Sequence, residues 1–278
     1  MSAVIGTVPY LNAEPLTAAW RSPDFAPGVE VRAEVPSRLA ESLRSGELDA
    51  ALVSVAAVLP DAGLRLLPGY GVASRERVRS IQLYFTRPLD EARIVALDAS
   101  SRSAQAQVKT LFGERFGRRP EYVERPPKLA AMLAEADCAL LIGNPALQAN
   151  QRLAAGAWDG PPLEQLDVGD LWRRHTGLPF VYAAWACPAD RDPAPLLDLL
   201  ARAAEWGIPR AAELARTRAA EVGIPEAVAV DYLTRAIHYR LDDADERGME
   251  RFLELGRRQG VFDSEAAVRW AMPRRPAR

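Results

Sequence analysis

The chain has 278 residues, 49% hydrophobic and 26% charged, which is the balance of an ordinary globular protein long enough for two α/β lobes. A formal net charge of -2 excludes a broad basic field for nucleic acid or anionic lipid, and no segment reaches the roughly 20 apolar residues of a membrane span. Two cysteines and two histidines, far apart in sequence, indicate neither a disulfide framework nor a metal site. We therefore expect a cytoplasmic protein without metal, membrane or nucleic-acid partners.

The first half of the chain alternates strand and helix patterns. Apolar or alternating runs predict strands at 4–8, 29–35 and 49–54, with helices at 15–20 and 36–46 between them. A second unit repeats this order, with strands at 80–85, 93–97, 121–124 and 139–142 and helices at 103–116 and 127–135. Strands separated by helices predict parallel pairing through βαβ units.

A buried strand is predicted at 180–185, after which the chain turns helical, with amphipathic patterns over 196–220, 227–240 and 247–258. Prolines near 88 and 179 suggest two crossings between lobes. The predicted lobes are residues 1–87 with 181–278, and residues 88–180. The helical tail is expected to pack on the first lobe, and the cleft between lobes is the expected ligand site.

The familiar catalytic signatures are missing from this sequence: it has no Gly-rich phosphate loop, nucleophile elbow or metal-ligand spacing. We interpret His175 as a surface or turn residue and His238, within a helical pattern, as a packing residue. The absence of an obvious catalytic acid or base favours a reaction that depends on positioning and on the substrate's own groups.

Several polar residues stand where a strand gives way to a helix or turn. Asn12 follows the first strand, so it either faces a ligand at the strand's carboxyl end or caps a helix. The serines of the segment 100–103 precede a helix, where hydroxyls and free N–H groups form a carboxylate site or a plain cap. Gly143 allows a tight turn, and Thr176 with Gly177 falls at the second crossing.

Three segments give the chain a family resemblance. Residues 5–16 read IGTVPYLNAEPL, residues 140–147 read LLIGNPAL, and residues 176–185 read TGLPFVYAAW. In this order the set resembles the chorismate dehydratases of the futalosine route to menaquinone, from the first strand to about Phe252. The resemblance implies a two-lobed, type 2 periplasmic-binding-protein-like α/β fold. It also implies a lyase that needs no cofactor and converts chorismate to 3-[(1-carboxyvinyl)oxy]benzoate, with a homodimer left open.

The resemblance also implies roles for individual residues. Asn12 corresponds to a residue implicated in dehydration, and Ser80, which follows Gly71-Val72 and opens a strand, corresponds to a substrate-contacting serine, although Ile81 and Gln82 depart from the family pattern. We expect both to be catalytic. The family commonly has an acid where Asn144 stands, which argues against an essential acid there. The expected substrate-binding residues are Tyr10, Ser100, Ser101, Arg102, Ser103, Gly143, Asn144, Thr176 and Gly177.

Two other functions compete with this interpretation. The first is 1,4-dihydroxy-6-naphthoate synthase of the same pathway, which we expect to carry a Ser-Pro-rich segment with an acid in the first loop, where this chain has Val8 to Asn12. The second is a non-catalytic solute-binding protein, which we expect to begin with a signal peptide or lipid-anchor cysteine. Here the N-terminal residues already read as a strand.

Overall fold

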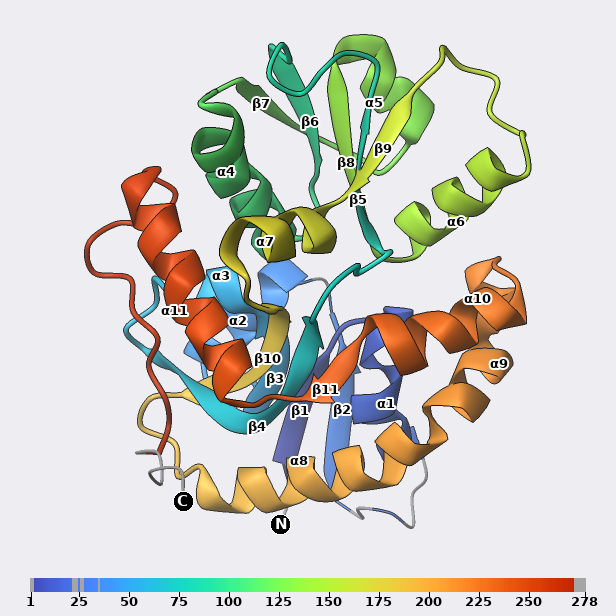
Figure 1. The fold of residues 1–278 in the computed structure, drawn as a ribbon. Helices are drawn as coiled ribbons and strands as arrows, with labels where there is room; N and C mark the ends of the chain where they lie inside the picture. The colour runs from blue at the N-terminus through green and yellow to red at the C-terminus, as the bar shows by residue number, and fades with distance from the viewer. Residues whose placement is uncertain (1–2, 22–24, 26–27, 35, 273–278) are drawn as a thin grey trace.

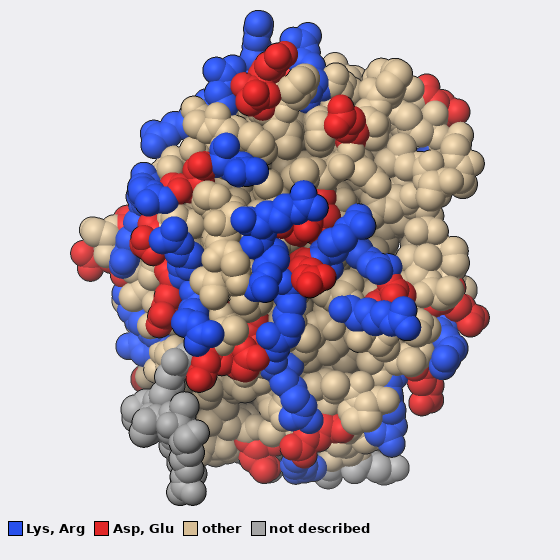
Figure 2. Space-filling model, in the orientation of Figure 1, with Lys and Arg blue, Asp and Glu red and all other residues tan. Residues whose placement is uncertain are grey.

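The computed structural model describes residues 3–21, 25, 28–34 and 36–272. Two separate mixed sheets, each covered by helices, form two lobes (Figure 1). This is the two-lobed α/β architecture that the sequence predicts. Acidic and basic side chains are interspersed over the face in Figure 2, in keeping with the near-neutral net charge. Within the described ranges, no helix is long and apolar enough to cross a membrane.

The first lobe contains the six-stranded sheet, in the order β11-β4-β10-β3-β1-β2. Its strands are β1 (Ala3–Thr7), β2 (Val29–Ala33), β3 (Ala50–Ser54), β4 (Leu64–Ser74), β10 (Phe180–Pro188) and β11 (His238–Arg240). β1 pairs in parallel with β2 and β3, as βαβ units require, whereas β10 runs antiparallel to β3 and β4. The long strand β4 was missing from our predictions, and Val35, at the end of the expected second strand, lies outside the described residues.

The helices of the first lobe come from both ends of the chain. They are α1 (Glu14–Thr17), α2 (Pro36–Arg44), α3 (Val55–Val58), α8 (Ala194–Gly207), α9 (Ala211–Val222), α10 (Glu226–Asp231) and α11 (Asp243–Arg258). The expected helix 196–220 is two helices, because a 3₁₀ turn containing Pro209 separates α8 from α9. Figure 1 shows the C-terminal helices wrapped around the first lobe, with α11 rising beside α4 of the second.

The expected helix 227–240 ends early, so our placement of His238 on a helix was wrong. α10 continues into the π-helical turn Tyr232–Ala236, and the chain then forms β11, which pairs antiparallel with the open edge of β4. Nε2 of His238 lies 2.8 Å from Oδ1 of the buried Asp245. The unpaired edge of β4, which sequence periodicity does not reveal, explains the change from helix to strand.

The second lobe contains the five-stranded sheet, in the order β7-β6-β8-β5-β9. Its strands are β5 (Ile81–Phe85), β6 (Ile94–Asp98), β7 (Glu121–Arg125), β8 (Cys138–Ile142) and β9 (Glu164–Asp167), and its helices are α4 (Arg102–Phe116), α5 (Leu129–Glu135), α6 (Gly143–Ala154) and α7 (Val168–Thr176). β6 pairs in parallel with β7 and β8, while β5 runs antiparallel to β8 and β9.

The first crossing between the lobes lies earlier than we predicted. β5 belongs to the second sheet, so residues 81–87 do not lie in the sheet of the first lobe, and the chain crosses between Ser74 and Ile81. Pro88 instead helps form the turn between β5 and β6, where a residue that fixes its own φ angle is equally useful. The second crossing joins α7 to β10 near Pro179.

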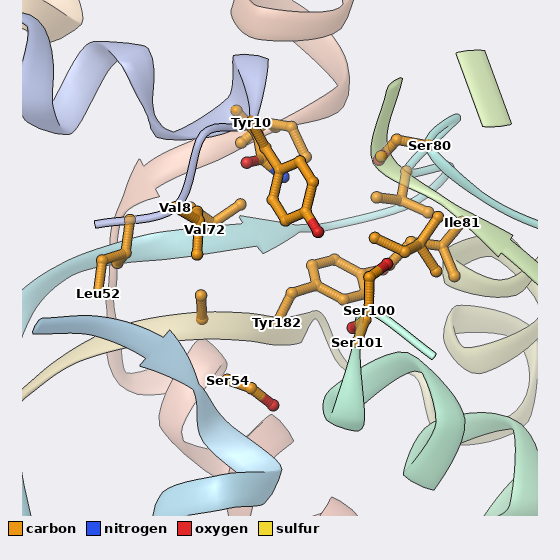
Figure 3. A pocket seen from close by; sticks show the side chains of 16 residues that line it. Val8, Tyr10, Leu52, Ser54, Val72, Ser80, Ile81, Ser100, Ser101 and Tyr182 are labelled. Carbon is orange, nitrogen blue, oxygen red and sulfur yellow. The ribbon is translucent and has the colours of Figure 1, made fainter. Parts of the chain in front are cut away.

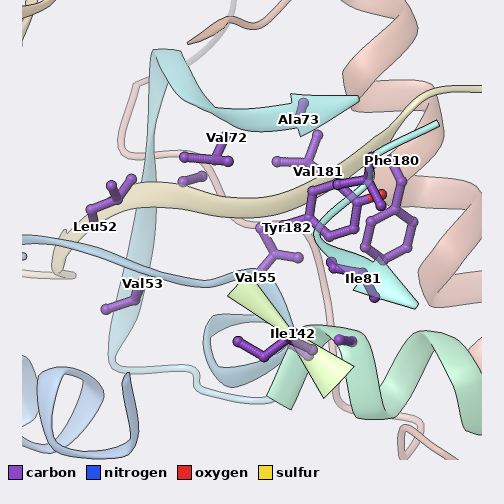
Figure 4. Close-up of a cluster of buried hydrophobic side chains, with 14 of the residues drawn as sticks. Leu52, Val53, Val55, Val72, Ala73, Ile81, Ile142, Phe180, Val181 and Tyr182 are labelled. Carbon is purple, nitrogen blue, oxygen red and sulfur yellow. The ribbon is translucent and has the colours of Figure 1, made fainter. Parts of the chain in front are cut away.

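The lobes share a continuous apolar contact. Figure 4 shows Ile81 and Ile142 of the second sheet beside Val55 and Tyr182 of the first lobe, and all four belong to one buried cluster. Nearby, the ring of Phe180 stacks edge-on against other aromatic rings from α7 and α11, with centroids 5.1 Å from Trp172 and 4.9 Å from Phe252. This packing holds the two lobes together beside the space between their sheets.

Candidate active site

A cavity opens between the two sheets, at the carboxyl ends of β1, β3, β6 and β8 (Figure 3). In open α/β sheets this edge is where ligands bind, because loops leave the strands there. About 590 Å³ of empty space lies between the lining residues when the open mouth is included. Its lining consists of Val8, Tyr10, Asn12, Leu52, Ser54, Val72, Val78, Ser80, Ile81, Ser100, Ser101, Ile142, Gly143, Tyr182, Ala183 and Ile237.

Six of the predicted site residues meet in this cavity: Tyr10, Asn12, Ser80, Ser100, Ser101 and Gly143. They come from the loop after β1, the first crossing, and the ends of β6 and β8, so both lobes contribute. Among the lining residues, all of which are described, none carries a carboxylate or a basic side chain. The polar groups that face a ligand are therefore hydroxyls, an amide and backbone N–H groups.

The loop after β1 brings Tyr10 and Asn12 to the cavity. In Figure 3 the ring of Tyr10 points from this loop toward Ser100 and Tyr182. A Cβ at Gly143 would stand 3.6 Å from the Tyr10 ring, and Gly143 has a φ of +61°, so a side chain at this position would be strained. Burial raises the pKa of Tyr10, while a hydrogen bond with Ser100 acts in the opposite direction.

Asn12 lies in the 3₁₀ turn Leu11–Ala13 and is half-buried. It caps neither the turn nor α1, because the N-cap positions are Tyr10 and Ala13. The capping alternative for Asn12 is thus excluded in this structure, and its amide is free to interact with the cavity and with the hydroxyl of Tyr232.

Ser80 is 2% exposed and is the last residue of the first crossing, directly before β5. The hydroxyl of Tyr232 donates a hydrogen bond of 2.7 Å to Ser80 Oγ. Burial raises the pKa of Tyr232 to about 12, although hydrogen bonds with Ser80 and Asn12 act to lower it. Tyr232 therefore keeps its proton at neutral pH and can donate it to Ser80, which leaves the Ser80 proton free for a ligand.

The N-terminus of α4 faces the same cavity. Ser101 is the N-cap, and its Oγ accepts from the backbone N–H of Ala104 at 3.3 Å. The N–H groups of Arg102 and Ser103, in the first turn, have no acceptor within the helix, and the helix dipole adds a partial positive charge there. Because its oxygen is the acceptor in the cap, the Ser101 hydroxyl can still donate its proton to a carboxylate.

Asp98, at the end of β6, is a buried acid that sequence analysis missed. Its carboxylate accepts from Ser100 Oγ at 2.5 Å, from the Ser100 N–H at 3.0 Å and from the Ile142 N–H at 3.1 Å. Burial raises the pKa of Asp98, and these hydrogen bonds act to lower it. The contacts join the ends of β6 and β8 and commit the Ser100 proton to Asp98. The position of Asp98 at the end of a predicted strand was the signal that could have revealed it.

The other predicted site residues lie outside the cavity lining. Ser103, about 200° around the helix from Ser101, is buried on the other side of α4, where Ser103 Oγ lies 2.6 Å from Ser54 Oγ and donates to the Tyr182 carbonyl at 2.8 Å. Arg102 is exposed and lines a separate groove with Lys109. The serines of this segment thus have different environments, set by the helical period.

Asn144, Thr176 and Gly177 also lie outside the lining of the cavity. Asn144 is half-buried in the first turn of α6. The Thr176 hydroxyl donates to the carbonyl of Trp172 at 2.9 Å, and Gly177 ends α7 with a φ of +73°. These last two residues shape the end of a helix, a role for which Thr-Gly is as well suited as for ligand contact.

Comparison with known proteins places the chain in a family. A family model described as "Menaquinone biosynthesis" matches residues 3–258. The chain belongs to this menaquinone-biosynthesis family. A curated relative, the chorismate dehydratase of Thermus thermophilus, is 32% identical over 261 residues, which cover 90% of this chain and 94% of the relative. These matches confirm the family resemblance that the segments 5–16, 140–147 and 176–185 indicated.

Solved structures establish the fold of this family member. Protein AF1704 from Archaeoglobus fulgidus superposes with a TM-score of 0.73 at 18% identity, covering 94% of this chain and 98% of that one. The alkanesulfonate-binding protein SsuA from Xanthomonas axonopodis gives a TM-score of 0.70 at 14% identity, with 96% of each chain covered. The periplasmic-binding-protein-like fold expected from the sequence is therefore confirmed.

Proposed function

We propose that this protein dehydrates chorismate to 3-[(1-carboxyvinyl)oxy]benzoate. The observation that carries the proposal is the 32% identity to a chorismate dehydratase along nearly the full length of both chains. The family match supports it, and neither comparison favours the naphthoate synthase or the solute-binding alternative. As an enzyme acting on an intracellular metabolite, the protein would work in the cytoplasm.

The chemistry of chorismate suits a cavity without a strong acid or base. Loss of water across the ether-bearing and hydroxyl-bearing carbons makes the ring aromatic, so the driving force is already present in the substrate. The hydrogen on the ether-bearing carbon is acidified through the adjacent double bond by the ring carboxylate. The enzyme must hold two carboxylates, stabilise charge that develops on the ring carboxylate, and assist departure of the hydroxide.

The donors of the cavity fit these tasks. The Ser101 hydroxyl and the N–H groups in the first turn of α4 would bind one carboxylate, at the positive end of the helix. Asn12 and Ser80 would donate to the other carboxylate or to the departing hydroxyl. Each oriented donor contributes on the order of 3 kcal/mol to lowering the barrier when it is aimed at developing charge.

The proton acceptor in this proposal is the enolpyruvyl carboxylate of the substrate. The cavity lining, which the structure describes completely, supplies no carboxylate, imidazole or amine of its own. The carbon–hydrogen bond breaks and its proton passes to that carboxylate. The electron pair forms the new ring double bond, and hydroxide leaves from the neighbouring carbon and receives the proton, so that one water molecule is released.

Incubation of the purified protein with chorismate tests the proposal. We expect the cyclohexadiene absorbance to fall and a product lighter than chorismate by one water to accumulate, identified by mass spectrometry. Release of pyruvate would show a different lyase, and binding of chorismate without turnover would favour a solute-binding protein. Light scattering of the same sample tests the homodimer, which stays a prediction.

A further inference from the structure

The first crossing between the lobes contains a strained turn immediately before Ser80. Arg79 has a φ of +63°, and among the described residues it is the one non-glycine residue with positive φ. The N–H of Ser80 donates to the carbonyl of Val78 at 2.8 Å. A hydrogen bond across three residues with a positive central φ is a γ-turn of the rare, strained kind. Such strain persists only where surrounding contacts hold it, and it concentrates at functional sites.

Two neighbouring residues of the C-terminal helical segment hold this turn. The side chain of Asp231, the last residue of α10, forms an ion pair with Arg79. The next residue, Tyr232, donates its hydrogen bond of 2.7 Å to Ser80 Oγ. Tyr232 is 1% exposed and begins a π-helical turn, a local distortion that often accompanies functional sites.

The second lobe secures the same turn by its backbone. Asp167, the N-cap of α7, accepts from the Val78 N–H at 3.0 Å and from the Arg79 N–H at 2.7 Å. The side chain of Asn150 donates to the Arg79 carbonyl at 2.9 Å. The backbone is therefore fixed from one lobe, while the side chains of residues 79 and 80 are fixed from the other.

We propose that Asp231 and Tyr232 are positioning residues, which hold the strained turn at Arg79 and orient the Ser80 hydroxyl toward the cavity. Because Tyr232 occupies a lone pair of Ser80, the Ser80 proton points away from Tyr232 and is available to the substrate. Tyr232 also contacts Asn12, so one buried hydroxyl orders both of the residues expected to act on chorismate. The inference rests on the proposed function only where its test measures turnover of chorismate.

Tyr232→Phe tests the orientation of Ser80. We expect kcat for chorismate to fall about tenfold with little change in KM, since the lost contact acts mainly in the transition state. Tyr239→Phe is the matched control, because Tyr239 is also buried and its hydroxyl has no hydrogen-bond partner among the described residues. Equal kcat values for both variants would overturn the role of Tyr232.

Substitutions at Arg79 separate the effect of backbone strain from the effect of the ion pair. Alanine at position 79 loses the ion pair with Asp231 and, like any residue with a Cβ, is strained at positive φ, whereas glycine loses the same ion pair and adopts positive φ without cost. We expect the glycine variant to retain about tenfold more turnover than the alanine variant. In a double variant, Arg79→Gly should restore most of the turnover that Asp231→Ala alone loses. Equal loss in the alanine and glycine variants, or no rescue, would contradict the proposal.

Crystal structures of Tyr232→Phe and Asp231→Ala provide a readout that does not depend on the reaction. We expect Ser80 Oγ to rotate in the first variant and residue 79 to leave the positive φ region in the second. An unchanged turn and rotamer in both would overturn the inference. Failure of the wild-type protein to convert chorismate would instead count against the proposed function and leave these structural outcomes decisive.

Discussion

At the scale of single residues, the site depends on which partner occupies each polar atom. Ser100 and Ser101 are neighbours, yet the Ser100 proton is held by Asp98 while the Ser101 oxygen is held by a backbone N–H. Ser101 can thus donate to a carboxylate and Ser100 can accept. The same reasoning applies to Ser80, whose oxygen accepts from Tyr232. Residue type alone does not distinguish these roles.

Asn12 is the residue on which turnover is expected to depend most directly. Asn12→Asp should keep the fold and nearly abolish turnover, because it adds a negative charge to a cavity that has no basic side chain and that receives a dianion. Asn12→Ala should lower kcat on the order of 100-fold and affect binding less, since a donor aimed at developing charge acts in the transition state. Steady-state kinetics and thermal unfolding of both variants provide the measurement. Near wild-type kcat in either would remove Asn12 from the mechanism.

At the scale of elements, the N-terminus of α4 is expected to bind a carboxylate. The double substitution of Ser100 and Ser101 by Ala should weaken chorismate binding, measured by calorimetry. It should also cost about 2–4 kcal/mol of stability through the lost cap and the lost hydrogen bond from Ser100 to Asp98. Ser103→Ala is the control, since Ser103 lies behind the cavity lining, where it supports the lining residues Ser54 and Tyr182. It should lower stability by about 1–3 kcal/mol and leave affinity unchanged. Unchanged affinity in a folded double variant would move the carboxylate site elsewhere.

The first turn of α11 links stability to pH through Asp242. This side chain caps the helix by accepting from the Ala244 N–H at 2.9 Å, and its contact with Arg75 lowers its pKa from 3.8 to about 2. Because the folded pKa lies below the unfolded one, ionised Asp242 stabilises the protein above about pH 4 and loses this effect as the pH falls toward 2.

Asp242→Ala should therefore lower the free energy of unfolding by about 1–2 kcal/mol at pH 7, mostly through the lost cap, since the Arg75 contact is half-exposed and screened. Urea titrations should show this difference from wild type shrinking between pH 4 and pH 3. The neighbouring Asp243→Ala, which does not cap the helix, should change stability by less than about 0.5 kcal/mol. A difference that grew on acidification would contradict the assignment.

At the scale of the whole molecule, the two lobes pack against each other through one apolar cluster and enclose a cavity lined by uncharged side chains. The described residues contain no group of three or more His, Cys, Asp or Glu side chains placed to hold a metal ion. Since the proposed reaction takes its driving force from aromatisation, we expect chorismate turnover to survive exhaustive treatment with EDTA. Loss of activity that returns only when a divalent metal is added would show that the reaction needs a metal.

Much of the fold was predictable because its elements are local. The parallel strands β1, β3, β6 and β8 and the helices after them show apolar periodicity and end signals within about ten residues. Strand ends also located Asn12 and Ser101, because ligands collect at the carboxyl edge of such sheets, whereas Ser80, which opens a strand, was located by the family resemblance. Thr176 and Gly177 were expected in the cleft because they fall at the second crossing; in the structure they form the end of α7 and lie outside the cavity lining, since the end of a helix and a ligand loop favour the same residues.

The sequence by itself determined most of the alternation of strands and helices and the resemblance that names the family. Only the tertiary structure decided that β5 joins the second sheet, that β11 completes the edge of β4, and that Tyr232 reaches Ser80, 152 residues earlier in the chain. The physical reason is the distance along the chain over which each kind of interaction acts. Periodicity and capping arise between residues a few positions apart, whereas strand partners and buried polar contacts depend on which distant surfaces meet when the apolar faces pack.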